Sequence, residues 1–265
     1  MNNQDDGDDI PEVSIILTTY NRPDALSRSI DSILSQSFNN FELIIIDDGS
    51  EKDTKDVILK FKDDRIKYYR FKNFGRPAKP RNEGIKRARG KYVAFCDDDD
   101  IWMENKIQYQ INLIKEKKVD GIFTNAINVD YPHEYGKLSN NKSGYISLKK
   151  LLSKNHFILS TSFIHKIIFD SIKFNEDEVF KGSEDFILWA NCLSMNKIFY
   201  YSSKPTIKYQ IQNQSSIRSS INLKNMHKIH FNHISKLIIS KNLNLLLIPY
   251  YAFFQMLRIL KYTFK

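Results

Sequence analysis

The chain has 265 residues, of which 42% are hydrophobic and 13% aromatic, so it holds enough apolar material for a packed core. This composition excludes a wholly disordered protein. The opening stretch MNNQDDGDDIPE is acidic and has no basic segment followed by an apolar one, so we do not expect it to be a signal peptide. We expect residues 1–11 to form a flexible acidic leader.

Charge is unevenly distributed along the chain. The net charge is +9, from 40 Lys and Arg against 31 Asp and Glu. Residues 186–265 hold eleven of the basic residues and no acidic one, which leaves 29 basic against 31 acidic residues before them. This split indicates that the last third faces something anionic. The two cysteines, Cys96 and Cys192, lie far apart in apolar stretches, which suits a reducing cytosol and predicts no disulfide framework.

The first half of the chain alternates apolar strands with helical patterns. In chain order the pattern predicts a strand at 13–19, a helix from Pro23, a strand at 41–47, a helix at 53–61, a strand at 66–71, a helix at 82–89, a strand at 91–95, a helix at 103–118 and a strand at 119–125. The strands lack a period of two, which is typical of a mostly parallel sheet with helices on both faces.

The second half is less regular. Residues 131–144 indicate a loop. After it the pattern predicts a short helix at 147–155, a strand at 160–166, a helix at 184–196, two short strands at 197–201 and 206–211, and two helices within 222–265.

Polar segments follow three of the predicted strands at the points where they end. These segments are TTYNR (18–22), DDGS (47–50) and CDDDD (96–100). Because ligands bind at the carboxyl ends of parallel strands, we expect the three segments to converge on one site.

The four consecutive carboxylates of residues 97–100 repel one another. Their oxygen atoms suit Mg²⁺ or Mn²⁺, which commonly bridge to phosphates. A solvated acidic loop, or an acidic start to the following helix, explains the run equally well from the residues alone.

Three further sites have both a functional and an ordinary structural explanation. GRPAKPRNEG (75–84) clusters three cations that suit a diphosphate, although a solvated basic loop would look the same. Asp48 could face a nucleobase or ribose, or simply belong to an Asp-Gly turn. Glu184 and Asp185 open a predicted helix, where acids favour the helix dipole and where a carboxylate could also act as a general base.

Several other motifs are absent or incomplete. The chain has no GxGxxG, and its Gly84–Lys91 segment is one residue too long for a P-loop. His227, His230 and His233 repeat every three residues, which spreads them over about 120° of a helix, more than one metal ion would use. The sequence therefore disfavours a dinucleotide cofactor and a histidine metal site.

Taken in order, four segments resemble the family 2 inverting glycosyltransferases of the GT-A fold. They are VSIILTTYNRPDALSRSIDSILSQSF, FELIIIDDGSEKDT, RNEGIKRARGKYVAFCDDDDIW and GSEDFILWA, and the resemblance covers about residues 12–215. It implies an α/β, Rossmann-like, mostly parallel central sheet flanked by helices, as a GT-A domain at 12–220. A helical, basic and aromatic C-terminal extension would follow at 221–265.

The resemblance also implies roles for individual residues. Asp185 would be the catalytic base, with Glu184 beside it, and Asp99 would be the leading ligand of Mn²⁺ or Mg²⁺. Asp100 matches a further acid common in the family. The donor nucleotide sugar would be bound by Thr18, Tyr20, Arg22, Asp48, Arg81, Asp97 and Asp98.

By the same resemblance the reaction is a single displacement. The base removes a proton from an acceptor hydroxyl, which attacks the anomeric carbon of a nucleotide sugar, expected to be a UDP sugar, with inversion. The acceptor would be a glycan or lipid-linked saccharide in surface polysaccharide biosynthesis, and the enzyme a hexosyl- or N-acetylhexosaminyltransferase. Many relatives carry a histidine after the last strand, whereas this chain has Gln212, Asn213 and Gln214, so metal dependence is expected to be looser.

Two other functions stay open. A nucleotidyltransferase that forms sugar nucleotides would share the sheet and the acids, but the chain has no glycine-rich loop near residue 12. A non-catalytic scaffold that binds nucleotide sugars at the membrane is the second alternative.

The basic extension predicts a partner of its own. The apolar run Leu245–Phe254 has ten residues, too short to cross a bilayer, and favours a helix lying on an anionic membrane surface. This places the protein in the cytoplasm, peripheral on the inner face of the cell membrane. Packing on the catalytic domain, or a homodimer interface, would explain the same run. Nucleic-acid binding is disfavoured, since no known module for it is present.

Overall fold

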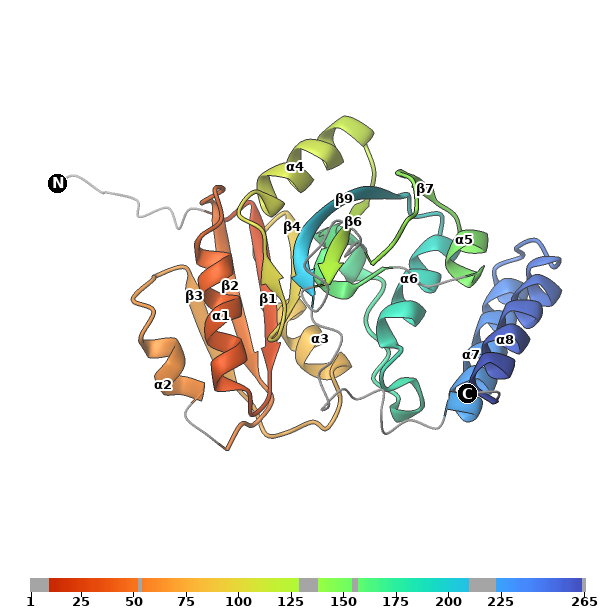
Figure 1. The fold of residues 1–265 in the computed structure, drawn as a ribbon, viewed down its shortest axis with the longest axis horizontal. Helices are drawn as coiled ribbons and strands as arrows, with labels where there is room; N and C mark the ends of the chain where they lie inside the picture. Colours follow the sequence, from red (N-terminus) through yellow and green to blue (C-terminus); the bar gives the residue numbers. More distant parts are fainter. Residues whose placement is uncertain (1–9, 52–53, 129–137, 154–156, 210–222, 264–265) are drawn as a thin grey trace.

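The computed structural model describes residues 10–51, 54–128, 138–153, 157–209 and 223–263. Its centre is a nine-stranded sheet whose strands follow the order β3-β2-β1-β4-β8-β6-β9-β5, with β7 paired to β9 beside this path (Figure 1). Helices cover both faces of the sheet, as the sequence predicts.

The first half of the sheet is parallel. It contains β1 (Val13–Thr19), β2 (Phe41–Asp47), β3 (Ile66–Arg70) and β4 (Tyr92–Asp97). The connecting helices are α1 (Pro23–Leu34), α2 (Thr54–Leu59) and α3 (Ala78–Arg87). The register sets Thr18 beside both Ile46 and Asp97, so the polar ends of three strands lie at one edge.

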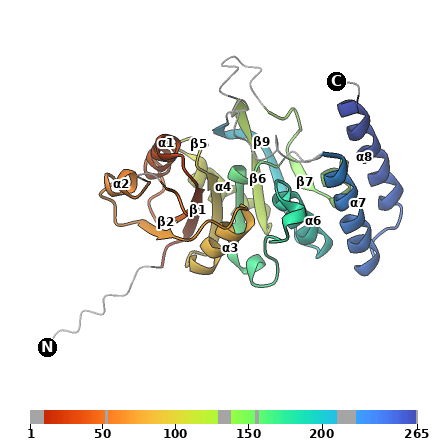
Figure 2. The ribbon, with the colours of Figure 1, turned by 90° about the horizontal axis from the view of Figure 1, so that it is seen from below.

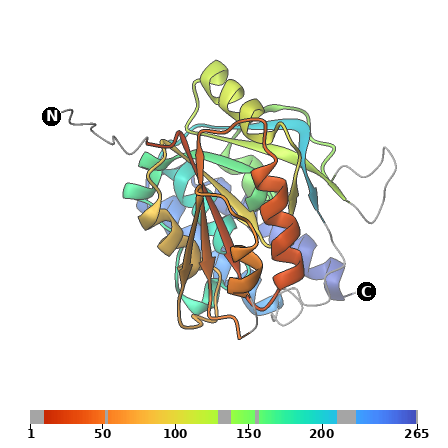
Figure 3. The same ribbon diagram turned by 90° about the vertical axis from the view of Figure 1, so that its left-hand side faces the viewer.

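Alternate residues of β1 face opposite helical layers. Ile15 and Leu17 pack in the cluster that contains the apolar stripe of α1, whereas Ile16 packs in the cluster that contains Ile85 of α3. Figure 3 shows α1 and α3 on opposite sides of the strands. Burial on both faces explains why β1 and β2 consist of continuous apolar runs.

The second half of the sheet is mixed. It contains β5 (Ile101–Trp102), β6 (Gly121–Asn128), β7 (Gly144–Ile146), β8 (Ser162–His165) and β9 (Phe199–Tyr209), with α4 (Lys106–Lys117), α5 (Leu148–Ser153) and α6 (Glu184–Ser194) around them. Strand β8 is antiparallel to both β4 and β6, while β6 and β9 are parallel. Strand β8 therefore joins the parallel half to the rest.

Several sequence predictions about element boundaries were wrong. The two short strands expected at 197–201 and 206–211 are one strand, β9, because a register shift against β6 near Asn125 accommodates Pro205 within the ladder. The two-residue β5 and the three-residue β7 were missed, since strands this short carry no periodicity. Helix α3 begins at Ala78, earlier than expected, because its first turn tolerates Pro80, and α4 begins later, at Lys106.

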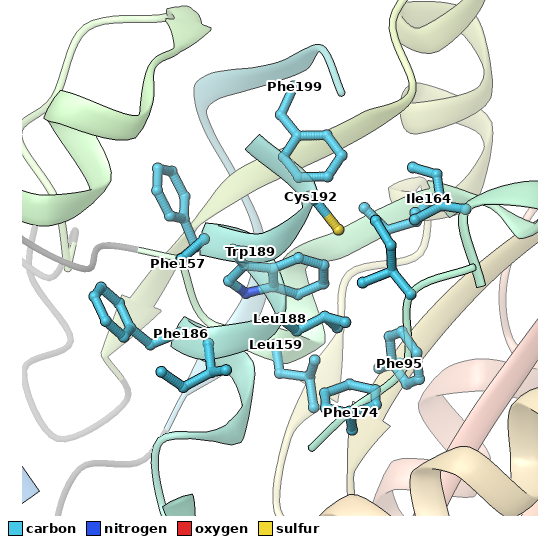
Figure 4. Close-up of a cluster of buried hydrophobic side chains, with 14 of the residues drawn as sticks. Phe95, Phe157, Leu159, Ile164, Phe174, Phe186, Leu188, Trp189, Cys192 and Phe199 are labelled. Carbon is cyan, nitrogen blue, oxygen red and sulfur yellow. The ribbon is translucent and has the colours of Figure 1, made fainter. Parts of the chain in front are cut away.

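Aromatic side chains anchor α6 to the sheet. Trp189 is fully buried, with its ring centroid 4.8 Å from that of Phe123 and 6.0 Å from that of Phe199, both in edge-on geometry. Figure 4 shows Trp189 among Phe157, Leu159 and Phe199. Cys192 lies in the same cluster as a free thiol. The start of α6 is therefore carried on a rigid support.

The C-terminal hairpin consists of α7 (Leu223–Ser240) and α8 (Leu247–Thr263), in the segment where two helices were predicted. It lies at the end of the molecule remote from α2, as Figure 1 and Figure 2 both show. Helix α7 contacts α6, and α8 contacts α5. Ile234, Ile238 and Tyr251 are fully buried in this packing. Within the described residues, no helix combines the length and hydropathy needed to span a bilayer.

Candidate active site

The three polar strand ends converge, as the sequence predicts. The Thr19 hydroxyl donates to the Asp98 carboxylate over 2.8 Å, and the Asp48 amide donates to the Thr19 carbonyl over 2.9 Å. The Asn21 amide donates to the Ser50 hydroxyl over 2.9 Å. These bonds fix TTYNR, DDGS and CDDDD against one another at the carboxyl edge of the parallel strands.

The Asp-Gly turn after β2 holds Asp48 in place. Gly49 has a φ of +83°, and a Cβ on it would lie 2.6 Å from the Asn73 backbone nitrogen, so the turn needs glycine. The buried Asp48 carboxylate accepts the Phe74 amide over 2.7 Å, and burial raises its pKa. Asp48 thus joins the strand end to the loop before α3.

Arg22 neutralises two of the four consecutive carboxylates. Its Nη1 lies 3.2 Å from Asp98 Oδ1 and 2.9 Å from Asp99 Oδ2. The Asp98 side chain is 7% exposed and the Asp99 side chain 24%. Burial raises the pKa of Asp98 to about 6, against the opposing effect of Arg22. Asp99 is therefore the member of this pair that an ion reaches more readily from solvent.

The other two carboxylates have different surroundings. Asp97 is bound through its side chain by Arg81, and its amide donates to the Ser160 hydroxyl over 3.0 Å. Asp100 is 1% exposed, and its burial together with the charge of Asp97 raises its pKa well above the usual range. The four consecutive aspartates therefore differ in exposure and in the groups that they contact.

A buried lysine lies behind the acidic loop. Lys106 is 0% exposed, its Nζ donates to Gln110 Oε1 over 2.7 Å, and the same atom lies 3.9 Å from the centroid of the Trp102 ring. Burial lowers the pKa of Lys106 to about 7, while Cys96 and Asp100 act in the opposite direction. Sequence reasoning missed this residue because it reads as an ordinary exposed position in a helix.

Ser29 was also missed. Its hydroxyl lies 2.9 Å from the carbonyl oxygen of Asp98 and 2.8 Å from that of Asp100, so α1 holds the backbone of the acidic loop. A signal existed in the sequence, because Ser29 interrupts the apolar stripe formed by Leu26, Ile30 and Ile33.

Arg81 joins the acidic loop to the second acid cluster. Its Nη1 donates to Glu184 Oε1 over 2.7 Å and its Nη2 donates to Asp97 Oδ1 over 2.9 Å. Burial alone would lower the pKa of Arg81, but the charges of Asp97 and Glu184 outweigh it and raise the pKa. The structure thus brings the two predicted acid clusters together, with Arg81 between them.

Glu184 and Asp185, the first two residues of α6, differ in exposure and in hydrogen-bond partner. Glu184 is 5% exposed and is paired with Arg81, whereas Asp185 is only part-buried and accepts the Phe186 amide over 2.7 Å. Asp185 is therefore the member of the pair that a ligand reaches more readily from solvent.

The remaining predicted residues lie around this centre. Thr18 is part-buried at the end of β1, and the Tyr20 side chain is 45% exposed. Of the other two cations in the segment 75–84, Arg76 donates to the Glu176 carbonyl, and Lys79 Nζ lies 4.5 Å from the centroid of the Phe74 ring. The loop with Gln212 lies outside the described residues.

The acidic loop, residues 97–100, is the candidate metal site. Its carboxylate oxygens are the right ligand type for Mg²⁺ or Mn²⁺. Among the residues that the structure describes, no three His, Cys, Asp or Glu side chains form a cluster that could hold a metal ion. Asp99 fits such an ion by chemistry and access, but it would have to exchange its contact with Arg22.

Comparison with known proteins gives one family consistently. Residues 14–170, more than half of the chain, match the profile of glycosyl transferase family 2. The Escherichia coli UDP-Glc:alpha-D-GlcNAc-diphosphoundecaprenol beta-1,3-glucosyltransferase WfaP is 32% identical over 82% of this chain and 89% of its own length. The Campylobacter jejuni GalNAc(5)-diNAcBac-PP-undecaprenol beta-1,3-glucosyltransferase is 31% identical over 88% of this chain and 75% of its own.

Other relatives are longer than this chain. An uncharacterised glycosyltransferase of Rickettsia bellii is 36% identical over 70% of the chain, and this match spans 27% of the relative. Among solved structures, Staphylococcus aureus TarS 1-349 with UDP-GlcNAc has a TM-score of 0.75 at 19% identity, covering 89% of this chain and 70% of that one. At this identity the likeness concerns the fold, which is GT-A as predicted. On the profile match and these relatives, the chain belongs to glycosyl transferase family 2.

Proposed function

We propose that the protein is an inverting glycosyltransferase that transfers glucose from UDP-glucose to a hydroxyl of a lipid-linked saccharide, in surface polysaccharide biosynthesis. The main support for this proposal is Arg81, which donates to both Asp97 and Glu184. The acidic loop, where we expect the donor, therefore lies next to the Glu184–Asp185 pair. The printed names of the E. coli and C. jejuni relatives, both glucosyltransferases with undecaprenol-linked acceptors, support the choice of substrates.

On the donor side, the converged strand ends supply the contacts. The exposed ring of Tyr20 offers a stacking surface for a nucleobase, and Asp48 and Thr18 flank it on the same sheet edge. Asp97 and Asp98 would accept sugar or ribose hydroxyls, while Arg22 and Arg81 would meet phosphate oxygens. These assignments require the two arginines to exchange carboxylate partners for phosphate when the donor binds.

On the acceptor side, Asp185 acts as the general base. It takes the proton of the acceptor hydroxyl as the oxygen forms a bond to the anomeric carbon. The bond from that carbon to the diphosphate breaks at the same time, and the nucleoside diphosphate leaves with the electron pair. Attack from the opposite face inverts the anomeric carbon, so an α-linked donor yields a β-glycoside.

A divalent cation, Mn²⁺ or Mg²⁺, is part of the proposal, with Asp99 as its ligand. When bound, the ion would supply positive charge to the leaving diphosphate. The solved mannosyltransferase PcManGT from Pyrobaculum calidifontis, TM-score 0.62 at 15% identity over 92% of this chain and 74% of its own, contains GDP-Man and Mn²⁺.

The C-terminal hairpin supports a membrane location. Its outward surface carries large apolar side chains that are 43–73% exposed, and we call this set the hairpin apolar face: Leu245, Leu246, Phe253, Met256, Leu257 and Leu260. The chain has no acidic residue from Phe186 onwards, so this end is attracted to anionic lipid. The proposed place is the inner face of the cell membrane, where a lipid-linked acceptor would be found.

The test is a transfer assay with purified protein. A panel of UDP and GDP sugars is offered with a synthetic α-GlcNAc-diphospholipid, with Mg²⁺, Mn²⁺ or chelator, and the product linkage is read by NMR. We expect a β-linked glucosyl product from UDP-glucose. Sugar-nucleotide formation from a sugar 1-phosphate and UTP would instead support a nucleotidyltransferase. Tight donor binding without any transfer would support a scaffold.

A further inference from the structure

The C-terminal hairpin contacts the turn that leads into the acid pair. This turn, residues 180–183, is followed directly by α6, and Gly182 adopts a φ of +78° within it. Ser183 occupies the position that begins α6, where serine commonly caps a helix. Here its hydroxyl makes no capping bond to α6 and is used for other contacts.

His230 of α7 is one of those contacts. Its Nε2 lies 2.6 Å from Ser183 Oγ, and the same hydroxyl lies 2.9 Å from the Phe180 carbonyl oxygen. A hydroxyl has a single proton, and the carbonyl can only accept, so the hydroxyl donates to Phe180 and the His230 ring donates to the hydroxyl. The imidazole thereby closes a chain of hydrogen bonds across the turn.

Ring contacts hold this imidazole in one orientation. It stacks on the Phe186 ring with centroids 5.4 Å apart and planes at 26°, and Tyr251 of α8 stacks against the same phenylalanine at 6.3 Å. His230 is 5% exposed and Phe186 4%. Helix α7 thus contacts the residues on both sides of Glu184 and Asp185, and α8 contacts Phe186 after them.

We propose that His230 is a positioning residue for the transfer reaction: through Ser183 it fixes the turn that places the Asp185 carboxylate. This inference rests on the proposed function, in which Asp185 is the base. A catalytic carboxylate displaced by about 1 Å costs on the order of 100-fold in rate. In this proposal the C-terminal hairpin both holds the turn before Asp185 and contacts the membrane.

The experiment compares three variants with the wild-type protein. His230→Ala removes the ring and its donor, and His230→Gln keeps an N–H donor at a similar reach. His233→Ala is the matched control, because His233 also packs on the turn, with its ring 5.0 Å from that of Phe180, but makes no bond to Ser183. For each we measure kcat, KM for UDP-glucose and the thermal midpoint.

We expect kcat of His230→Ala to fall roughly 10-fold to 100-fold with KM for the donor unchanged, and His230→Gln to recover most of it. The two alanine variants should lower the thermal midpoint similarly, while His233→Ala keeps wild-type kcat. Equal kcat losses in both alanine variants, or a kcat of His230→Ala within twofold of wild type, would overturn the inference.

A second substitution covers the case in which His230→Ala does not fold. Ser183→Ala removes the acceptor and leaves the ring stack in place, and it should reduce kcat without altering donor KM. Combined with His230→Gln, Ser183→Ala should reduce kcat no more than it does alone, since the same hydrogen bond is lost only once.

If Asp185→Asn keeps full turnover, the proposed function itself fails. If Asp185→Asn is inactive and Ser183→Ala is not impaired, the positioning role alone fails.

Discussion

The acidic loop of the parallel half differs from the Glu184–Asp185 end of the molecule, which we call the acid-pair end, in where the partners of its carboxylates come from. In the parallel half, Asp98 and Asp99 are held by Thr19 and Arg22, which belong to the neighbouring strand end. At the acid-pair end, Glu184 is held by Arg81 from the other half, and the preceding turn is held by His230 from the hairpin. The first set follows from local sheet geometry, and the second depends on contacts between distant segments.

Under the proposed function, this difference separates the residues that bind the donor from the residue that removes the proton. A rigid sheet edge suits a donor whose nucleotide is always presented in the same way. An acid pair supported from two other elements is set by how those elements pack, so it is open to change without altering donor binding. Substitutions in the two regions should therefore have separable effects.

Asp185→Asn should remove the base and leave the sheet edge intact. We expect kcat to fall on the order of 10²–10⁴-fold, with UDP-glucose affinity in calorimetry changing by less than about threefold. Asp177→Asn, an exposed acid before the same helix, serves as the control and should retain activity. Retention of more than a third of kcat by Asp185→Asn would assign the base elsewhere.

Arg81→Met should break the link between the two halves. It leaves the Asp97 and Glu184 carboxylates without their shared partner, and we expect the free energy of unfolding in urea to fall by about 3–5 kcal/mol. Arg65→Met breaks the more exposed pair with Asp63 and should cost no more than about 1 kcal/mol. Equal costs for the two variants would show that the bridge does not join the halves energetically.

Asp98 should make the metal-free protein less stable as pH rises. Its folded pKa, about 6, lies above the ordinary value of 3.8, so the folded state holds this proton more tightly than the unfolded chain does. Its contribution is therefore fully present below about pH 4 and is lost as pH rises through 6, by up to about 3 kcal/mol. Unfolding in urea with chelator, compared between wild type and Asp98→Asn from pH 4.5 to 7, should show this difference. A difference that grows in the opposite direction would contradict it.

Phe253→Asp should weaken membrane contact and leave soluble turnover unchanged. Placing a charge on the hairpin apolar face should reduce partition onto phosphatidylglycerol vesicles by about tenfold. Ile167→Asp is the control, because Ile167 is an exposed apolar residue, 69% against 52% for Phe253, and lies far along the chain from the hairpin. Equal losses of vesicle partition in both variants would contradict membrane contact through the hairpin apolar face. If the wild-type protein forms concentration-dependent dimers and Phe253→Asp is monomeric, the face is a homodimer interface instead.

Much of the parallel half could be predicted from the sequence. Continuous apolar runs identified β1, β2 and β4, and parallel topology then required their polar ends to meet, which the bond from Thr19 to Asp98 confirms. Each of these inferences depends on residues close in sequence or on a rule about sheets. The roles of individual donor-binding residues remain predictions.

The acid-pair end could be predicted only in part. Residues 184 and 185 were identified by resemblance, but nothing in the sequence pairs Glu184 with Arg81, 103 positions away, or Ser183 with His230, 47 positions away. The spacing of His227, His230 and His233 bears on metal binding, and it gives no sign that His230 stacks on Phe186. Such contacts arise from how helices pack, and periodicity carries no information about the partner.

The only two tryptophans of the chain are placed so that each reports on one of these regions. Trp102 lies two residues after Asp100, with the Lys106 ammonium over its ring, while Trp189 lies in α6 little more than one turn after Asp185. Both are buried, so their emission depends on protein surroundings rather than on bulk water. Replacing either one by phenylalanine would leave a single fluorophore, and donor arrival and acid-pair movement could then be followed separately by light.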